Sequence, residues 1–191
     1  MLEQIIAFDK EMFLFFNSLH SPFWDSVMYA ISGKYLWIPL YLGIIFFYFK
    51  KNGKKAYWIL LFTILAVSLA DLISVHAFKN VFERLRPCHE PTLQGLVYVV
   101  NGKCGGQFGF VSSHAANMFA VAVFTLNIFR NKFFTAFILC WALVVSYSRI
   151  YLGVHYPADV VCGALLGSAV SMALISAKKL WQTENELPAK T

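Results

Sequence analysis

Long apolar runs separated by short basic clusters dominate this chain. Five of these runs have the hydrophobic character of membrane-spanning helices: residues 35–49, 56–78, 114–129, 133–147 and 158–177. Several of them are shorter than the roughly 20 residues that cross a bilayer comfortably, so their ends are expected to shift by a few residues. The pattern predicts an all-α fold, a polytopic transmembrane helical bundle with about five membrane spans.

Residues 1–33 follow a different pattern, in which apolar and charged positions lie on opposite sides of a helix. The apolar positions are Leu2, Ile5, Ile6, Met12, Phe13 and Phe16, opposite Glu3, Gln4, Lys10 and Glu11. This spacing is typical of an interfacial helix lying in the membrane plane, and it equally fits a helix packed on the bundle. Pro22 then restarts the chain before a short apolar stretch at 23–31. If that stretch also crosses, there are six spans, and the side of the N-terminus stays open.

Composition supports a membrane protein and excludes several other classes. The chain is 59% hydrophobic and 14% charged, with a mean hydropathy of +0.61. Soluble domains have about 45–50% apolar and about 25% charged residues, so an ordinary soluble or disordered protein is excluded. The formal net charge is +6, but the cations cluster at the ends of apolar runs rather than along one stripe. This arrangement argues against nucleic-acid binding. A length of 191 residues predicts a single domain, 1–191.

The basic clusters also predict the orientation of the chain. They are Lys50/Lys51/Lys54/Lys55, Arg130/Lys132 and Lys178/Lys179, at alternate ends of successive spans. Placing all three in the cytoplasm satisfies the positive-inside rule with five crossings. The polar segments 79–113 and 148–157 then lie together on the outer, extracytoplasmic face. No Asn-x-Ser/Thr sequon occurs, which is compatible with a bacterial source. We therefore expect a bacterial inner membrane protein with these segments facing the periplasm.

The outer segments hold an unusual set of polar groups. They are Lys79 and Arg86 after the second span, Ser112, Ser113 and His114 at the start of the third, and Arg149, His155 and Asp159 between the last two. Each alone has an ordinary interpretation, as a lipid-headgroup anchor, a helix cap or a structural histidine. Together, three cations beside a helix N-terminus form a site for a phosphate anion.

A site that only bound phosphate would not need a histidine held by a carboxylate. His155 and Asp159 are four residues apart, so one helical turn brings the carboxylate to the imidazole Nδ1–H. That contact would fix the tautomer and leave Nε2 free to attack, as in a catalytic triad.

These positions resemble the three signature motifs of the type 2 phosphatidic acid phosphatase superfamily. The motifs are Lys79…Arg86-Pro87, Ser112-x-His114 and Ser148-Arg149…His155…Asp159, in the correct order across residues 79–159. The second motif departs from the usual Pro-Ser-Gly-His, because this chain has Val111-Ser112-Ser113-His114.

The resemblance implies a metal-independent lipid phosphatase with no cofactor. His155 would attack phosphorus and form a phosphohistidine, His114 would protonate the leaving oxygen, and Asp159 would orient His155. The phosphoryl oxygens would be held by Lys79, Arg86, Ser112, Arg149 and the backbone N–H of Ser113. No carboxylate cluster suggests a magnesium site, and no His/Cys set has zinc spacing.

Five further positions have open interpretations. Asp71 lies inside the second span and is either functional or a structural hydrogen-bonding group. Arg84 and His89 would contact a second phosphate or sugar, or anchor to lipid headgroups. Cys88 and Cys104 bracket the outer segment, and a disulfide between them is expected if that face is oxidising.

The leading function is hydrolysis of a phosphate monoester or diphosphate on a membrane lipid at the outer membrane–water interface. The same residues would also suit a lipid-to-lipid phosphotransferase, and a non-catalytic lipid-binding protein is a third alternative. Undecaprenyl diphosphate, phosphatidylglycerol phosphate, phosphatidic acid and lipid A phosphates all carry the group to be recognised. The expected partner is a phosphorylated membrane lipid, and the sequence indicates no obligate protein partner. It leaves the substrate and the oligomeric state undetermined.

Overall fold

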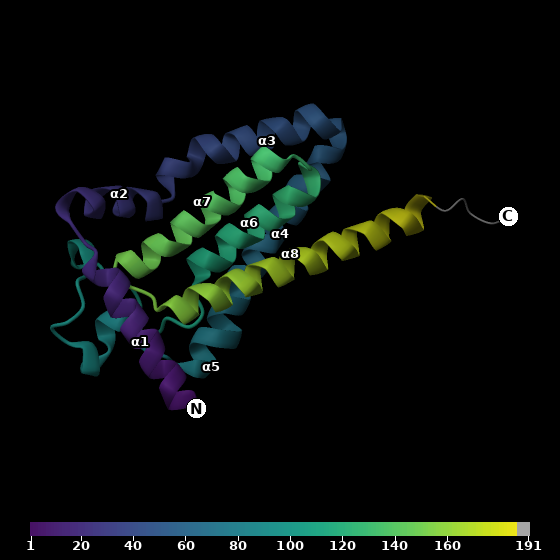
Figure 1. The fold of residues 1–191 in the computed structure, drawn as a ribbon. Coiled ribbons are helices and arrows are strands. Elements are labelled where there is room, and N and C mark those ends of the chain that lie inside the picture. The colour runs from purple at the N-terminus through teal and green to yellow at the C-terminus, as the bar shows by residue number, and fades with distance from the viewer. Residues whose placement is uncertain (187–191) are drawn as a thin grey trace.

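The structure, a computed structural model, describes residues 1–186, with side chains through residue 177 and at residue 179. Every regular element within these residues is helical, apart from one isolated antiparallel bridge, which confirms the predicted all-α class. The later long helices run roughly along one axis, and the first two helices of the chain lie at one end of this bundle (Figure 1). That end is called the site end below.

The five predicted apolar runs coincide with the five long helices. These are α3 (Ile38–Asn52), α4 (Ala56–Ile73), α6 (Ser113–Ile128), α7 (Lys132–Tyr151) and α8 (Pro157–Glu186). α4 continues through a π-helical turn, Ser74–Lys79, into the short α5, Asn80–Phe82. Among the described residues, three helical segments are long and apolar enough to span a membrane: Tyr35–Phe82, Lys132–Tyr151 and Pro157–Ala177. The first contains both α3 and α4, which reverse direction at Gly53, and α6 is a shorter apolar helix.

The central helix is α6, which packs against α4, α7 and α8. Close approach of α8 depends on Gly163 and Gly167, because a Cβ atom at either position would collide with the carbonyl oxygen of Ser112 or Ala116 on α6. This Gly-x-x-x-Gly spacing lets helix backbones approach closely, as is common in membranes. Ser171 continues the contact by donating to the Ala120 carbonyl at 2.8 Å. The contact fixes the start of α6 beside the start of α8.

Large apolar side chains face outward along the long helices. Leu61, Ile64 and Leu65 on α4 are 40–54% exposed, and Leu165 on α8 is 65% exposed. The buried positions of α6, in contrast, include the small residues Ala115, Ala116 and Ala120. Apolar exteriors and small residues at helix contacts are expected of helices surrounded by lipid. The chain is therefore an integral membrane protein.

At the site end, α1 (Leu2–Ser18) crosses the bundle and α2 (Pro22–Ser32) lies against α7 (Figure 1). The buried residues of α1 are Asp9, Phe13 and Asn17. Asn17 donates to the Tyr98 and Tyr151 carbonyls at 2.9 Å each. The exposed side includes Leu2, Ile5 and Phe8. α1 thus packs on the bundle through a partly polar face, while apolar residues are exposed as an interfacial helix requires.

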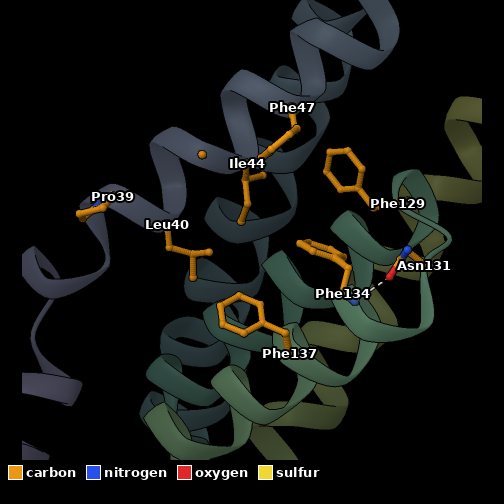
Figure 2. A pocket seen from close by; sticks show the side chains of 9 residues that line it. Pro39, Leu40, Ile44, Phe47, Phe129, Asn131, Phe134 and Phe137 are labelled. Carbon is orange, nitrogen blue, oxygen red and sulfur yellow. Dashed lines mark hydrogen bonds between the residues drawn. The ribbon is translucent and has the colours of Figure 1, made fainter.

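The opposite end carries the turns that join α3 to α4 and α6 to α7. Lys51 Nζ donates to the Ile128 carbonyl at 2.5 Å, so the basic clusters at 50–55 and 130–132 share this end. Next to them is a cavity of about 420 Å³, lined mainly by apolar side chains from α3, Phe129 and α7 (Figure 2). Side chains of Leu40, Phe47 and Phe134 point into it.

Candidate active site

The segment between α5 and α6 folds back on itself and thereby places two arginines. Leu85 and Phe108 form an antiparallel bridge, and Gly109 N donates to the Arg84 carbonyl at 2.8 Å. A disulfide joins Cys88 to Cys104, with the Cα atoms 6.0 Å apart. The disulfide and the bridge connect the same two stretches of chain, which holds the backbone around residues 84–86 against that of 104–109.

Arg86 is held by backbone carbonyls from the returning stretch. Its Nε donates to the Phe108 carbonyl at 3.2 Å and its Nη1 to the Cys104 carbonyl at 3.1 Å. Gly105 lies so close that a Cβ there would be 3.3 Å from Nη1. Burial lowers the pKa of Arg86, and the charge of Asp159 opposes this effect. Because carbonyls carry no full charge, the guanidinium remains available to an anion.

The residues at the start of α6 form a helix cap that also contacts Asp159 and Lys79. Ser112 Oγ accepts from Ala115 N at 3.5 Å, and Ser112 N donates to the Asp159 carbonyl at 2.9 Å. Ser113 Oγ accepts from Lys79 Nζ at 2.6 Å, and Lys79 comes from the π-helical turn after α4. The helix therefore begins at Ser113 although the sequence lacks the usual Pro and Gly of this motif.

His155 and Asp159 face each other in the buried turn between α7 and α8. His155 Nδ1 lies 3.3 Å from Asp159 Oδ2, which also accepts from Tyr156 N at 3.0 Å. The side chains are 2% and 0% exposed. Burial lowers the pKa of His155 to about 4, although its hydrogen bond to Asp159 acts in the opposite direction. The imidazole is therefore neutral at physiological pH, and the Nδ1–H tautomer leaves a lone pair on Nε2.

Arg84 supports this carboxylate, a role that differs from both sequence-based alternatives. Its Nη1 donates to Asp159 Oδ1 at 2.8 Å and its Nη2 to Asp9 Oδ2 at 2.6 Å. The guanidinium also lies over the Tyr156 ring, 4.1 Å from the centroid. Asp9 in turn accepts from Ala158 N, in the first turn of α8, at 2.8 Å. A chain of contacts thus runs from the N-terminal helix to the histidine.

Sequence reasoning missed Asp9 because it is 75 residues from Arg84 and lies on α1, whereas Arg84 lies in the outer segment after α5. The only sign of its role in the sequence is that this carboxylate lies next to the apolar positions of α1, and this does not indicate which residue it contacts.

The last two residues of the predicted site are His114 on α6 and Arg149 on α7. His114, in the first turn of α6, interacts electrostatically with Arg149, His155 and Arg86. Arg149, near the end of α7, donates through Nη1 to Ser32 on α2, while its buried Nε has no hydrogen-bond partner. All eight residues predicted from the sequence lie at the site end. They are Lys79, Arg86, Ser112, Ser113, His114, Arg149, His155 and Asp159.

The remaining candidates have local contacts. Asp71 Oδ1 accepts from Asn117 on α6 at 3.3 Å, which favours its structural interpretation. His89 Nε2 lies 3.4 Å from the Gly105 carbonyl oxygen. Within residues 1–186, Cys88, His89 and Cys104 are the only group with metal-ligand spacing, but the two cysteines are joined in the disulfide. Disulfide sulfurs are not thiolate ligands, so this group does not fit a metal ion.

Comparison with known proteins gives one consistent result. The PAP2 superfamily profile matches residues 56–182. The lipid A 4'-phosphatase of Bacteroides thetaiotaomicron is 42% identical over 87% of this chain and 75% of its own length. The undecaprenyl-diphosphatase of Sulfolobus acidocaldarius is 31% identical over 88% of this chain and 78% of its own. The PAP2-type phosphatidylglycerolphosphate phosphatase of Bacillus subtilis has a similar fold, with a TM-score of 0.66 and 22% identity over 92% of this chain and 87% of that one.

Proposed function

The chain belongs to the PAP2 superfamily and is a lipid phosphatase, and from this premise we propose that it hydrolyses its substrate through a phosphohistidine on His155. The observation that supports this most directly is the buried pair of His155 and Asp159. A neutral imidazole whose Nδ1 is oriented by a carboxylate is a nucleophile, and three cations surround the space next to it. The reaction needs no metal ion, because Lys79, Arg86 and Arg149 supply the positive charge.

In the first step, the Nε2 lone pair of His155 attacks phosphorus. The bond from phosphorus to the lipid oxygen breaks, and protonated His114 gives its proton to that oxygen. The arriving phosphate anion favours the protonated form of His114, since opposite charges stabilise each other. Arg86 and Arg149 stabilise the negative charge on the phosphoryl oxygens, together with Lys79, Ser112 and the Ser113 N–H.

In the second step, a water oxygen attacks the phosphohistidine. His114 accepts a proton from this water, the phosphorus–nitrogen bond breaks, and inorganic phosphate leaves. His155 returns to its neutral form. Asp159 stabilises the positive charge that His155 carries while the phosphoryl group is attached, as the carboxylate of a catalytic triad does.

The preferred substrate class is a phosphorylated glycolipid of the lipid A type. The support is the 42% identity to a lipid A 4'-phosphatase, which exceeds the 31% identity to an undecaprenyl-diphosphatase. A prenyl diphosphate is therefore the second candidate. A phosphotransferase would use the same residues with a lipid acceptor in place of water. A non-catalytic lipid-binding protein would use the cations alone.

We further propose that the chain lies in a bacterial inner membrane as one domain with five crossings and the active site facing the periplasm. The support is that the basic clusters at 50–55 and 130–132 share the end opposite the site, as the positive-inside rule requires. In this orientation α1 lies at the periplasmic surface with its apolar residues toward the lipid. The substrate reaches the site from the outer half of the bilayer.

The proposal is tested by measuring phosphate release from purified protein with EDTA present. Substrates are lipid A, undecaprenyl diphosphate, phosphatidylglycerol phosphate and phosphatidic acid, each given to wild type and to His155→Ala. Release that survives EDTA and is lost in the variant is expected. Equal release by the variant would contradict the assigned nucleophile. Transfer to an added lipid with little free phosphate would indicate a phosphotransferase.

A further inference from the structure

A cavity of about 510 Å³ opens beside the phosphate-binding arginines. Arg86 and Arg149 form part of its wall, and the end of α2 with the residues after it, the outer segment and the connection between α7 and α8 form the rest. This volume lies in the range of small-molecule sites, which is about 300–1,000 Å³, and it leaves room for more than one phosphate group. Arg86 and Arg149 belong both to this cavity and to the proposed phosphate site, so the rest of a headgroup would lie in the cavity.

The charged residues that line this cavity are all positive. Its lining includes four cations, Arg86, Arg149, Lys34 and Lys103, and no Asp or Glu. The two lysines lie outside the family motifs and have no role in the phosphate site described above. The apolar cavity at the other end of the bundle, in contrast, has no charged lining residue (Figure 2). A headgroup with negative charge fits only the first of these two cavities.

Neither lysine is neutralised by a neighbour. Lys103 Nζ donates to the Tyr29 hydroxyl at 3.2 Å, and Lys34 Nζ lies 5.3 Å from the centroid of the Tyr35 ring. Neither makes any of the ion pairs found among the described residues. A phosphate monoester carries a charge of about −1.5 to −2 at pH 7. A single phosphate at the two arginines therefore leaves the charge of both lysines unbalanced.

The walls that carry these charges are fixed in place. Arg149 binds Ser32 at the end of α2, just before Lys34. Asp25, also on α2, accepts from the hydroxyls of Tyr98 and Tyr151 at 2.7 Å each. These contacts tie α2 to the outer segment and to α7. A cavity formed before the ligand arrives loses less conformational entropy on binding.

We propose that Lys34 and Lys103 form a second anion subsite that binds a further negatively charged group of the substrate headgroup. The inference rests on the proposed function and narrows it to lipids with at least two anionic groups. Two sources share this chemistry: a phosphate on another part of a sugar headgroup, and the second phosphate of a diphosphate. The subsite lowers KM for such lipids without taking part in bond cleavage.

The test compares KM for two lipid A species, one with both phosphates and one with only the 4'-phosphate, and for undecaprenyl diphosphate. The enzymes are wild type, Lys34→Ala/Lys103→Ala, and Lys54→Ala as a control at the opposite end. Hydrogen bonds to charged groups are each worth about ten-fold in affinity. We expect the double variant to raise KM about ten-fold or more for a two-phosphate lipid. KM for the monophosphorylated lipid is expected to stay within two-fold.

The three lipids distinguish the two origins of the second anionic group. They also distinguish a failure of the subsite from a failure of the proposed function. A KM effect on bisphosphorylated lipid A places the second anion on the headgroup, and an effect on the prenyl diphosphate places it on the adjoining phosphate. An unchanged KM for both, or an equal change for the monophosphorylated lipid, overturns the subsite. If the wild-type enzyme releases phosphate from none of the three lipids, the proposed function itself is contradicted. Restored KM in Lys34→Arg/Lys103→Arg confirms that charge is the cause.

Discussion

Replacing Asp9 with Asn tests whether the N-terminal helix positions the catalytic pair. Asparagine has the same shape, and its side-chain oxygen still accepts from Ala158 N. It removes the negative charge that binds Arg84 at 2.6 Å. Arg84 then keeps its hydrogen bond to Asp159, at 2.8 Å, and its contact with the Tyr156 ring. The change therefore isolates one link in the chain of contacts from α1 to His155.

The expected loss of unfolding free energy follows from how deeply the Asp9–Arg84 ion pair is buried. The side chains of Asp9 and Arg84 are 8% and 24% exposed, between a fully buried and a surface ion pair. Hydrogen bonds to charged groups contribute about 1.5–3 kcal/mol and exposed ion pairs about 0–1 kcal/mol, so we expect a loss of about 1–2 kcal/mol. At about 2–4 °C per kcal/mol for a chain of this size, Tm falls by about 2–8 °C.

Asp9→Asn should also lower kcat, because the lost contact positions a catalytic group as well as stabilising the fold. With one anchor lost, Arg84 holds Asp159 less firmly, and the imidazole that Asp159 orients is displaced from its line of attack. Misplacement of a reacting group by about 1 Å can cost about a hundred-fold in rate. We expect kcat of Asp9→Asn to fall about ten-fold, with KM changed less than two-fold. Phosphate release and thermal unfolding in detergent measure the two effects.

Glu11→Gln is the matched control, because Glu11 is an exposed carboxylate on the same helix. It should match wild type in Tm and kcat. The double variant of Asp9→Asn with Arg84→Gln should be no slower than Arg84→Gln alone, since the two residues act through one contact. A wild-type kcat in Asp9→Asn, whether or not Tm falls, would refute the positioning role.

Three further outcomes follow from the geometry. Gly109→Ala puts a Cβ 3.1 Å from the catalytic carboxylate oxygen and 3.5 Å from His155 Nδ1, so kcat should fall about ten-fold, while an unchanged kcat would contradict this packing. Replacing Cys88 and Cys104 by Ser opens a loop worth about 3 kcal/mol, so Tm should fall by about 6–12 °C relative to wild type, and equal Tm values would count against the disulfide. Burial lowers the pKa of His155 from 6.5 to about 4, so the folded state resists a protonation that the unfolded chain undergoes. The unfolding free energy of the protein should therefore fall as the pH drops from 6.5 to about 4, and it should fall more in wild type than in His155→Asn. Equal acid sensitivity of the two proteins would contradict a buried neutral imidazole.

The helices and the motif residues were predictable because their signals are local. The apolar runs predict α3, α4, α6, α7 and α8, with ends displaced by a few residues except at the end of α8, which continues to Glu186. The four-residue spacing of His155 and Asp159 predicts their contact, although the structure makes it from the turn before α8 rather than within one helical turn, because α8 begins at Pro157. Ser112 is likewise an expected cap, and it performs that role without the usual Pro and Gly.

The parts that sequence could not supply depend on contacts between distant segments. Arg84 has the same sequence signature as a headgroup anchor, and only the placement of α1 shows that it binds Asp9 and Asp159. The helical pattern of residues 1–18 likewise does not show that α1 packs with Asp9 and Asn17 inward. Lys34 belongs to no motif and borders the polar cavity only because α2 is held against α7.

The proposed mechanism requires His155 to carry the phosphoryl group during turnover. The deciding experiment mixes the purified enzyme with lipid labelled in its phosphate, stops the reaction in alkali, and locates the label by mass spectrometry. Wild type is sampled at short quench times, because His114 acts in both steps and its replacement would slow the formation of the intermediate as well as its breakdown. Label is expected on His155, and it should be absent in His155→Ala and from Ser113. Label on a serine, or turnover with no labelled enzyme under any quench time, would contradict the mechanism.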